Sequence, residues 1–370
     1  MSTATTLHRL YTGEGGVDFV GRRKLWYLIT GVVVAVAFIA MLVRGFTWGI
    51  DFEGGTKMNL PADGVDETRV VEVFEQSTGT EPQKVQVVGA GDSRVMEINS
   101  VLLSEEQITQ AREDLFNEFH PTNSSGQETP DVIGDSTVSE SWGSTITNRM
   151  LISFGVFLLL VFGYIAIRFE RDMAIAAIAG LAVDAVVVAG IYSLIGFEVT
   201  PATIIGLLTV LAFSLYDTVV VFDKVKENTA GFTSTTRRTY AEQANLAVNQ
   251  TVMRSISTTL FSALPILALM VVAVWLMGVG TLKDLSLVQL IGVIEGTFSS
   301  IFLATPILVS LKMRQKEVAR HTEAVLAERE GDAARAEELK EQARERGTTK
   351  RHVDLSTRQD SSSATWRPGM

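Results

Sequence analysis

The sequence of 370 residues contains no cysteine and only four histidines. The absence of cysteine excludes disulfide frameworks, thiolate metal sites and cysteine nucleophiles. Two of the histidines, His321 and His352, lie in a charged tail, so a histidine metal cluster is not expected. A nucleotide-binding loop or hydrolytic motif is not visible either. We therefore expect no metal, no cofactor, no nucleic-acid partner and no enzymatic activity.

Basic residues are scarce in one long segment of the chain. Residues 45–147 contain 19 acidic but only 5 basic residues, a balance of −14. The whole chain carries −10, so the remaining residues sum to +4. A difference of this size indicates that the two parts of the chain face different compartments.

Long hydrophobic runs occupy most of the remaining sequence. A run of about 18 or more apolar residues is long enough to cross the hydrocarbon core of a bilayer as a helix. The first run begins too far from the N-terminus, is too long and lacks the cleavage site of a signal peptide, so we interpret it as a retained span. The six predicted spans are Leu25–Val43, Met150–Ile167, Met173–Phe197, Pro201–Phe222, Ser255–Gly278 and Leu285–Leu311.

The predicted fold is thus a polytopic α-helical membrane protein with six transmembrane helices. Residues 1–24 precede the first span (25–43), and residues 149–311 form the bundle of the other five. Lysine and arginine collect on the cytoplasmic side of membrane proteins. Their positions predict that both termini are cytoplasmic and that the acidic segment 44–148 lies outside.

The outside segment has the pattern of one α+β domain. The predicted elements are strands at 56–60, 84–88, 94–98 and 131–138, and helices at 66–77 and 104–119. The second helix begins with a capping box, Ser104 with Gln107. The order β-α-β-β-α-β is that of a ferredoxin-like unit, which has no chemistry of its own. Both a structural cap or docking module and a domain that contacts substrate remain open.

The residues after the last span, 312–370, form a charged cytoplasmic tail. Residues 312–346 are rich in Ala, Glu, Lys, Arg and Gln, which predicts a solvated helix. Residues 348–370 are polar and rich in serine and threonine, which predicts disorder. The tail is therefore predicted to be partly disordered.

Three carboxylates, Asp184, Asp217 and Glu295, lie inside predicted spans. An ionisable side chain there costs about 2.5–3.5 kcal/mol on insertion scales, so it indicates a function. Arg254 lies at the inner end of the fifth predicted span and approaches the membrane from the same side as Asp217. An arginine beside a buried aspartate favours its ionised form, and withdrawing the arginine favours protonation. We therefore predict a proton relay of Asp217, Arg254 and Asp184. A role in helix packing alone remains the alternative for the two aspartates, and a positive-inside anchor or a snorkelling side chain remains the alternative for Arg254.

Four motifs follow one another along the chain at the predicted spans. They are GIDFEGGT (49–56), SLYDTVVVFDKVKEN (214–228), NQTVMRSISTT (249–259) and SSIFLATP (299–306). In this order and placement they resemble the SecD/SecF family of protein-export membrane proteins, relatives of the RND transporters. The resemblance covers most of the chain, from about residue 17 to residue 313.

The resemblance implies a subunit of the SecDF complex, which uses the proton motive force to assist SecYEG-dependent export across the bacterial cytoplasmic membrane. Implied partners are SecD, the SecYEG translocon, YajC and secreted preproteins, besides the lipid bilayer. The family's proton-path aspartate matches Asp217, its arginine matches Arg254, and Asp184 matches an aspartate of the third span. The family motif after the first span, which shapes the turn into the domain, is matched by Gly49, Asp51, Gly54 and Gly55.

Two other functions remain open. Half of an RND-type proton-driven exporter for lipids or small molecules would need a second six-span half, supplied by a second chain. A scaffolding subunit would hold SecD and SecYEG together without moving protons. Secretion by an Asp217→Asn variant distinguishes the scaffold from the proton-driven subunit.

Overall fold

The computed structural model describes residues 16–349 except 63, 90, 124–125 and 277–279. Within these residues six helical runs are long and apolar enough to cross a membrane, and each overlaps one of the six predicted spans. They are α2 (Arg23–Arg44), α6 (Glu140–Arg168), α7 (Arg171–Ile195), α8 (Pro201–Asn228), α9 (Tyr240–Leu269), and α10 (Gly280–Ser299) continued by α11 (Thr305–Lys312). Most of the stretch predicted to be disordered, 350–370, lies outside the described residues.

Helices α8 and α10 approach each other most closely in the middle of the bundle, because glycines line their contact. A Cβ atom on Gly206 would lie 2.3 Å from Val288 Cγ1, and one on Gly292 would lie 2.3 Å from Val210 Cγ2. At Gly296 it would lie 2.7 Å from Ser214 Cβ. Small residues of this kind let helix backbones pack closely in membranes, where hydrophobic burial does not drive association.

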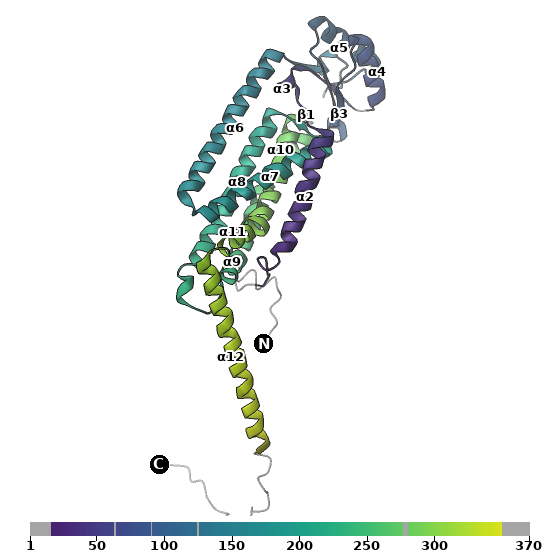
Figure 1. Cartoon of the computed structure of the whole chain (residues 1–370). Helices are drawn as coiled ribbons and strands as arrows, with labels where there is room; N and C mark the ends of the chain where they lie inside the picture. Colours follow the sequence, from purple (N-terminus) through teal and green to yellow (C-terminus); the bar gives the residue numbers. More distant parts are fainter. Residues whose placement is uncertain (1–15, 63, 90, 124–125, 277–279, 350–370) are drawn as a thin grey trace, which may run out of the picture.

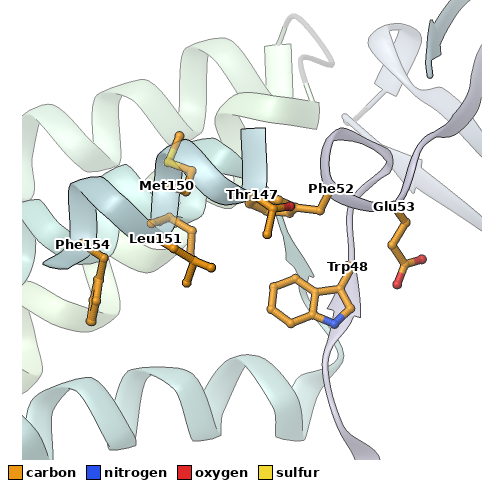
Figure 2. Close-up of a pocket in the computed structure, with 8 residues that line it drawn as sticks. Trp48, Phe52, Glu53, Thr147, Met150, Leu151 and Phe154 are labelled. Carbon is orange, nitrogen blue, oxygen red and sulfur yellow. The ribbon is translucent and has the colours of Figure 1, made fainter. Parts of the chain in front are cut away.

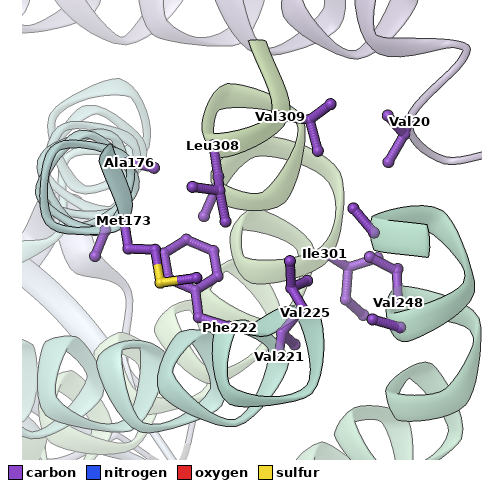
Figure 3. Close-up of a cluster of buried hydrophobic side chains, with 14 of the residues drawn as sticks. Val20, Met173, Ala176, Val221, Phe222, Val225, Val248, Ile301, Leu308 and Val309 are labelled. Atoms are coloured by element: carbon purple, nitrogen blue, oxygen red, sulfur yellow. The ribbon is translucent and has the colours of Figure 1, made fainter. Parts of the chain in front are cut away.

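The largest hydrophobic cluster lies at the end of the bundle opposite the α+β domain. It joins α6, α7, α8, α9 and the last helical run, with Phe222 and Leu308 fully buried (Figure 3). Ile165 of α6 is fully buried in the same cluster. Helix α6 lies at the edge of the bundle and exposes most of its apolar side chains, for example Leu159 and Ile167 (Figure 1). An exposed apolar surface on a helix of this length fits contact with lipid or with another membrane helix.

Two π-helical stretches interrupt the last two spans. One covers Met270–Leu276 after α9, and the other covers Ser300–Ala304 between α10 and α11. In the second stretch the Thr305 hydroxyl donates to the Ser300 carbonyl over 3.2 Å, and Pro306 follows. The Thr305 hydroxyl is thus an additional donor to the backbone in the turn before Pro306, which has no N–H of its own to donate.

The segment between α2 and α6 folds into a four-stranded antiparallel sheet with two helices on one face (Figure 1). Every element lies within three residues of its predicted bounds, and the strand order across the sheet is β3-β4-β2-β5. In chain order they are β2 (Gly55–Pro61), α4 (Glu67–Thr78), β3 (Lys84–Val88), β4 (Val95–Ser100), α5 (Glu105–Phe119) and β5 (Gly134–Val138).

Side chains alternate between the two faces of the sheet along each strand, and this determines which of them form the core of the domain. Met58 and Leu60 on β2 and Ile98 on β4 point to one face and pack against Phe74 of α4 and Leu115 of α5. The predicted capping box of α5 is confirmed: the Ser104 hydroxyl accepts from the Gln107 backbone at 3.2 Å, and the Gln107 side chain accepts from the Ser104 backbone at 3.0 Å.

After the last span, α12 (Lys316–Thr349) runs away from the bundle as a single helix (Figure 1). Its first half touches the bundle. Arg329 donates two hydrogen bonds of 2.8 Å to the carboxylate of Glu242 at the start of α9. His321 is buried against the ring of Phe232 and bonds the Thr235 carbonyl at 2.8 Å. These contacts join α12 to the connection between α8 and α9.

Candidate functional site

Asp217 lies where α8, α9 and the π-helical stretch of the last span meet, and its side chain is 4% exposed. The Ser255 hydroxyl of α9 donates to Asp217 Oδ1 over 2.7 Å. The Ser300 hydroxyl donates to Asp217 Oδ2. Ser300 opens the π-helical stretch, and such stretches occur frequently at functional sites.

The Ser300 hydroxyl has a second acceptor within reach, the Thr297 carbonyl at 3.0 Å. A hydroxyl carries a single hydrogen, so Ser300 donates either to Asp217 or to Thr297. When Asp217 is ionised, Ser300 donates to its carboxylate. When Asp217 is protonated, it can donate to the Ser300 oxygen while Ser300 turns to Thr297. The surroundings therefore satisfy both protonation states of Asp217.

The sequence predicted Arg254 as the partner of Asp217, and the structure brings the two to the same contact between α8 and α9. Arg254 is exposed, and its Nη2 donates to the Tyr216 hydroxyl at 3.1 Å. Tyr216 and Asp217 are neighbours on α8, just as Arg254 and Ser255 are on α9. Among the residues described, Arg254 and Asp217 do not form an ion pair. The Arg254 guanidinium lies on the exposed surface of the α8–α9 pair, whereas Ser255 faces the buried contact between the two helices.

Asp184 lies near the middle of α7 and is 2% exposed. The Ser214 hydroxyl, one turn before Asp217 on α8, donates to Asp184 Oδ2. The other carboxylate oxygen, Oδ1, is buried without a hydrogen-bond partner among the described residues. Ser214 and Asp217 lie one turn apart on α8, so the Asp184 carboxylate of α7, which Ser214 bonds, lies about one turn from Asp217, and serine hydroxyls bond both carboxylates.

The glycine-rich motif after α2 shapes the connection to the α+β domain. The Gly49 N–H donates to the Val199 carbonyl at 2.9 Å, where β1 (Thr47–Trp48) pairs with β6 (Glu198–Val199) in parallel. Gly54 (φ +81°) ends the short helix α3 (Ile50–Glu53), which carries the partly buried Asp51. Gly55 (φ +145°) cannot hold a side chain, because a Cβ atom would lie 2.5 Å from the Ser100 carbonyl oxygen.

A network of charges, which the sequence did not reveal, joins the sheet to the bundle. Glu198, in the connection between α7 and α8, is 2% exposed. Lys57 Nζ of β2 lies 3.7 Å from Glu198 Oε1 and 4.0 Å from Glu97 Oε2. Asn99 of β4 donates to Glu198 Oε2 over 3.2 Å. Glu198 is the one charged residue of the loop 196–200, which was the only signal available in the sequence.

The start of α10 reaches the same network. Lys283 donates to the Gln86 side-chain oxygen at 3.4 Å, and Gln86 donates to Glu97 Oε2 at 2.8 Å. Burial lowers the pKa of Lys84 below its ordinary value, and the nearby Glu198 carboxylate opposes this shift. The sheet, α7, α8 and α10 are therefore coupled by a partly desolvated set of ionic contacts.

A mainly apolar cavity of about 450 Å³ lies between α6 and the motif after α2 (Figure 2). Trp48 and Phe52 line one side, and Met150, Leu151 and Phe154 of α6 line the other. It lies away from the buried aspartates. Among the described residues, three or more His, Cys, Asp or Glu side chains do not gather in a way that could hold a metal ion.

Two family models match the chain. Residues 120–314 match the protein export membrane protein SecD/SecF C-terminal model, which includes all three intramembrane carboxylates. Residues 39–64 match the SecD/SecF GG motif model, which contains Gly54 and Gly55. The first match alone covers more than half of the chain.

Similar proteins carry the same family names. A protein translocase subunit SecF from Mycobacterium tuberculosis (strain ATCC 25618 / H37Rv) is 57% identical over 323 residues, which cover 87% of this chain and 73% of that protein. The Streptomyces coelicolor protein translocase subunit SecF is 39% identical over 337 residues, 91% of this chain and 88% of that protein.

Among solved structures, a crystal structure of SecDF from Thermus thermophilus is similar with a TM-score of 0.68 and 29% identity. The match covers 80% of this chain but only 39% of that longer one. From the family models and these relatives, the chain belongs to the SecD/SecF family of protein-export membrane proteins, on the SecF side of that family.

Proposed function

We propose that this protein translocase subunit couples proton movement through the membrane to protein export, with Asp217 as its proton-binding residue. The observation that carries the proposal is the setting of Asp217: a buried carboxylate whose serine donors satisfy it in both the charged and the neutral state. Such donors keep the carboxyl group hydrogen-bonded through both uptake and release of a proton.

Arg254 has the complementary role in this proposal. Its guanidinium donates to Tyr216, the residue before Asp217 on α8. Arg254 itself precedes Ser255, the α9 residue that donates to Asp217. A rotation of the guanidinium toward Asp217 would favour the ionised carboxylate, and its return to Tyr216 would favour proton uptake. Alternation between these positions couples protonation to a movement of α9 against α8.

The partners and the membrane follow from the family and from the charge pattern. We place the subunit in the bacterial cytoplasmic membrane with both termini in the cytoplasm, since basic residues collect at that end of the bundle. The SecDF-named relatives support SecD as the partner that completes the complex. SecYEG, YajC and the exported preproteins belong to the same proposal, in which the chain acts without enzymatic activity.

The α+β domain would then lie on the outer side of the membrane. Its strand order, β3-β4-β2-β5, supports the ferredoxin-like assignment. The ionic contacts of Glu198 and Lys57 give movements in the bundle a direct route to this domain.

Secretion by membranes that carry Asp217→Asn tests the proposal. Asparagine keeps the size of the side chain and can still accept from Ser255, but it cannot bind and release a proton. We expect the variant to be present in the membrane at normal level and to lose the part of secretion that depends on the proton gradient. Asp131→Asn, an exposed residue of the α+β domain, is the matched control and should secrete normally.

Arg254→Met should impair gradient-dependent secretion as severely as Asp217→Asn. Normal gradient-dependent secretion by Asp217→Asn would refute the proton step and favour a scaffolding subunit. A mild effect of Arg254→Met alone would leave Asp217 as the proton site and remove Arg254 from the relay.

A further inference from the structure

Glu295 lies on α10 next to the glycines that pack against α8. The residues around it read Gly292-Val-Ile-Glu-Gly296, and both glycines face α8 with no room for a side chain. At Gly296 an added Cβ would lie 3.1 Å from the Ser214 hydroxyl oxygen. The backbone next to Glu295 is therefore fixed at the depth of Ser214, the residue that donates to Asp184.

Helix α7 meets α10 at the same depth. Gly180, one turn before Asp184, faces the Ser299 hydroxyl of α10, which an added Cβ would approach to 3.4 Å. Tyr192 near the end of α7 bonds Asp284 near the start of α10, so the two helices run in opposite directions. Asp184, one turn after Gly180, and Glu295, one turn before Ser299, therefore lie at the same depth on neighbouring helices. Three helices thus bring two carboxyl groups and two serines together inside the membrane.

Several polar atoms of this cluster are incompletely bonded. Asp184 Oδ1 and Ser299 Oγ are both buried without a well-formed hydrogen bond to a described residue, and the Ser299 hydroxyl lies beside the Asp184 carboxyl group. Glu295 makes neither a hydrogen bond nor an ion pair with any described residue. A lysine or arginine does not pair with either carboxyl group in the described part of the chain. Two like charges in this setting repel each other, so one of the groups takes up a proton, as in other carboxyl pairs.

We propose that Glu295 and Asp184 form a second proton-binding site that holds one proton between two carboxyl groups, one helical turn from Asp217. This rests on the proposed function, which it deepens. In a transfer, the O–H bond of the Glu295 carboxylic acid breaks, an O–H bond forms on Asp184 Oδ1, and the negative charge moves to Glu295. Ser214 keeps its donation to Asp184 Oδ2 throughout.

The nearby charged groups on the packed helices are consistent with this site. Asp184 lies on α7, Asp217 and its neighbour Tyr216 on α8, Arg254 on α9, and Glu295 on α10 itself. Asp217 already has two hydroxyl donors and Arg254 bonds Tyr216, so neither supplies a partner to Glu295. The proton is therefore shared between Asp184 and Glu295.

Infrared difference spectroscopy of the full chain in vesicles tests the pair directly, because protonated carboxyl groups absorb in a region free of other protein bands. We expect a protonated carboxyl band that Glu295→Gln removes and that Asp184→Asn shifts. Glu113→Gln, on the exposed surface of α5, is the control and should leave the band unchanged. A band unaffected by Glu295→Gln, or a Glu295 band unaffected by Asp184→Asn, overturns the proposal.

Secretion measurements separate this inference from the proposed function. We expect Glu295→Gln to lower gradient-dependent secretion by about tenfold or more, and Glu295→Asp, which keeps a titratable group, to recover part of it. If Asp217→Asn abolishes this secretion while Glu295→Gln leaves it intact, only the second site fails. If Asp217→Asn has no effect, the proposed function fails, and the infrared result still decides whether the carboxyl pair exists.

Discussion

Substitution of Gly206 by alanine should test whether the glycine contact between α8 and α10 sets the geometry of the buried carboxyl groups. The new Cβ would lie 2.3 Å from Val288 Cγ1 and 3.2 Å from Leu285 Cδ1. Carbon atoms pack at about 3.5–4.0 Å, so the helices would have to separate by roughly 1 Å. Val288 is 0% exposed and β-branched, so its side chain cannot rotate out of the way.

Overpacking of this kind costs about 1–3 kcal/mol of unfolding free energy. The separation would also move α10, and with it Glu295, away from α8, so gradient-dependent secretion should fall in parallel. The matched control is Gly155→Ala on α6, where an added Cβ meets nothing within 4 Å. That change should stay within about 0.5 kcal/mol of the wild type and leave secretion unchanged.

Val288→Ala supplies the compensating change, because it removes the Cγ1 atom that the new methyl group would strike. The single Val288→Ala variant leaves a cavity and is itself destabilised. In the double variant the alanine at position 206 fills part of that space, so we expect a favourable coupling of about 0.5–3 kcal/mol. Denaturant titration of the full chain in detergent micelles, followed by circular dichroism, measures all four proteins. Equal stability of Gly206→Ala and Gly155→Ala, or purely additive effects in the double variant, would refute the reasoning.

Two further changes test contacts outside the buried site. Glu198→Gln should lower the free energy of unfolding by about 1–3 kcal/mol, since it removes the nearer of two carboxylates beside Lys57 and leaves Glu97, 4.0 Å away, as its partner. Unfolding of the variant in micelles measures the loss, and a wild-type value would show that the Glu198–Lys57 pair does not stabilise the junction. At Glu170, the hydrogen bond from Lys312 holds the pKa of the carboxyl below its ordinary value. That stabilisation is complete above the ordinary pKa of glutamate and is lost as the pH falls through the lowered value. Lys312→Met should therefore be less stable than the wild type at neutral pH, by no more than about 1 kcal/mol because Glu170 is half exposed, and the two should converge in acid; a gap that persists in acid would contradict it.

The spans and the elements of the α+β domain could be predicted from the sequence because both depend on local patterns. A run of apolar residues such as 25–43 needs a bilayer wherever the chain folds, and alternation in 84–88 needs one buried face. The Ser104 capping box depends on residues three apart, so it too is visible in the sequence.

The surroundings of the site depend on contacts that no local pattern specifies. Ser300 meets Asp217 across 83 positions of sequence, and only because a π-helical turn directs it there. Asp184 and Glu295 reach the same depth through glycines at the α7–α10 and α8–α10 contacts, which in the sequence look like any other small residues of a membrane helix. The expected contact of Arg254 with Asp217 was based on their positions along the sequence. These positions could not show that Ser255 would lie on the buried face of α9 and Arg254 on its exposed face.

The same three helices carry both the buried carboxyl groups and the ionic junction to the α+β domain, and this connects the two ends of the molecule mechanically. From Asp184 the helix continues to Ile195, about 16.5 Å of rise, and Glu198 follows three residues later. At the junction the Tyr192 hydroxyl donates to the Asp284 carbonyl at 2.7 Å, which joins α7 to α10 just below Lys283. Packed helices move as rigid bodies that slide by small amounts rather than bend continuously. A change in the charge of Asp217 or of the Asp184–Glu295 pair that moved α8 or α10 would therefore displace Glu198 and Lys283 together, and with them the sheet that holds Lys57 and Gln86.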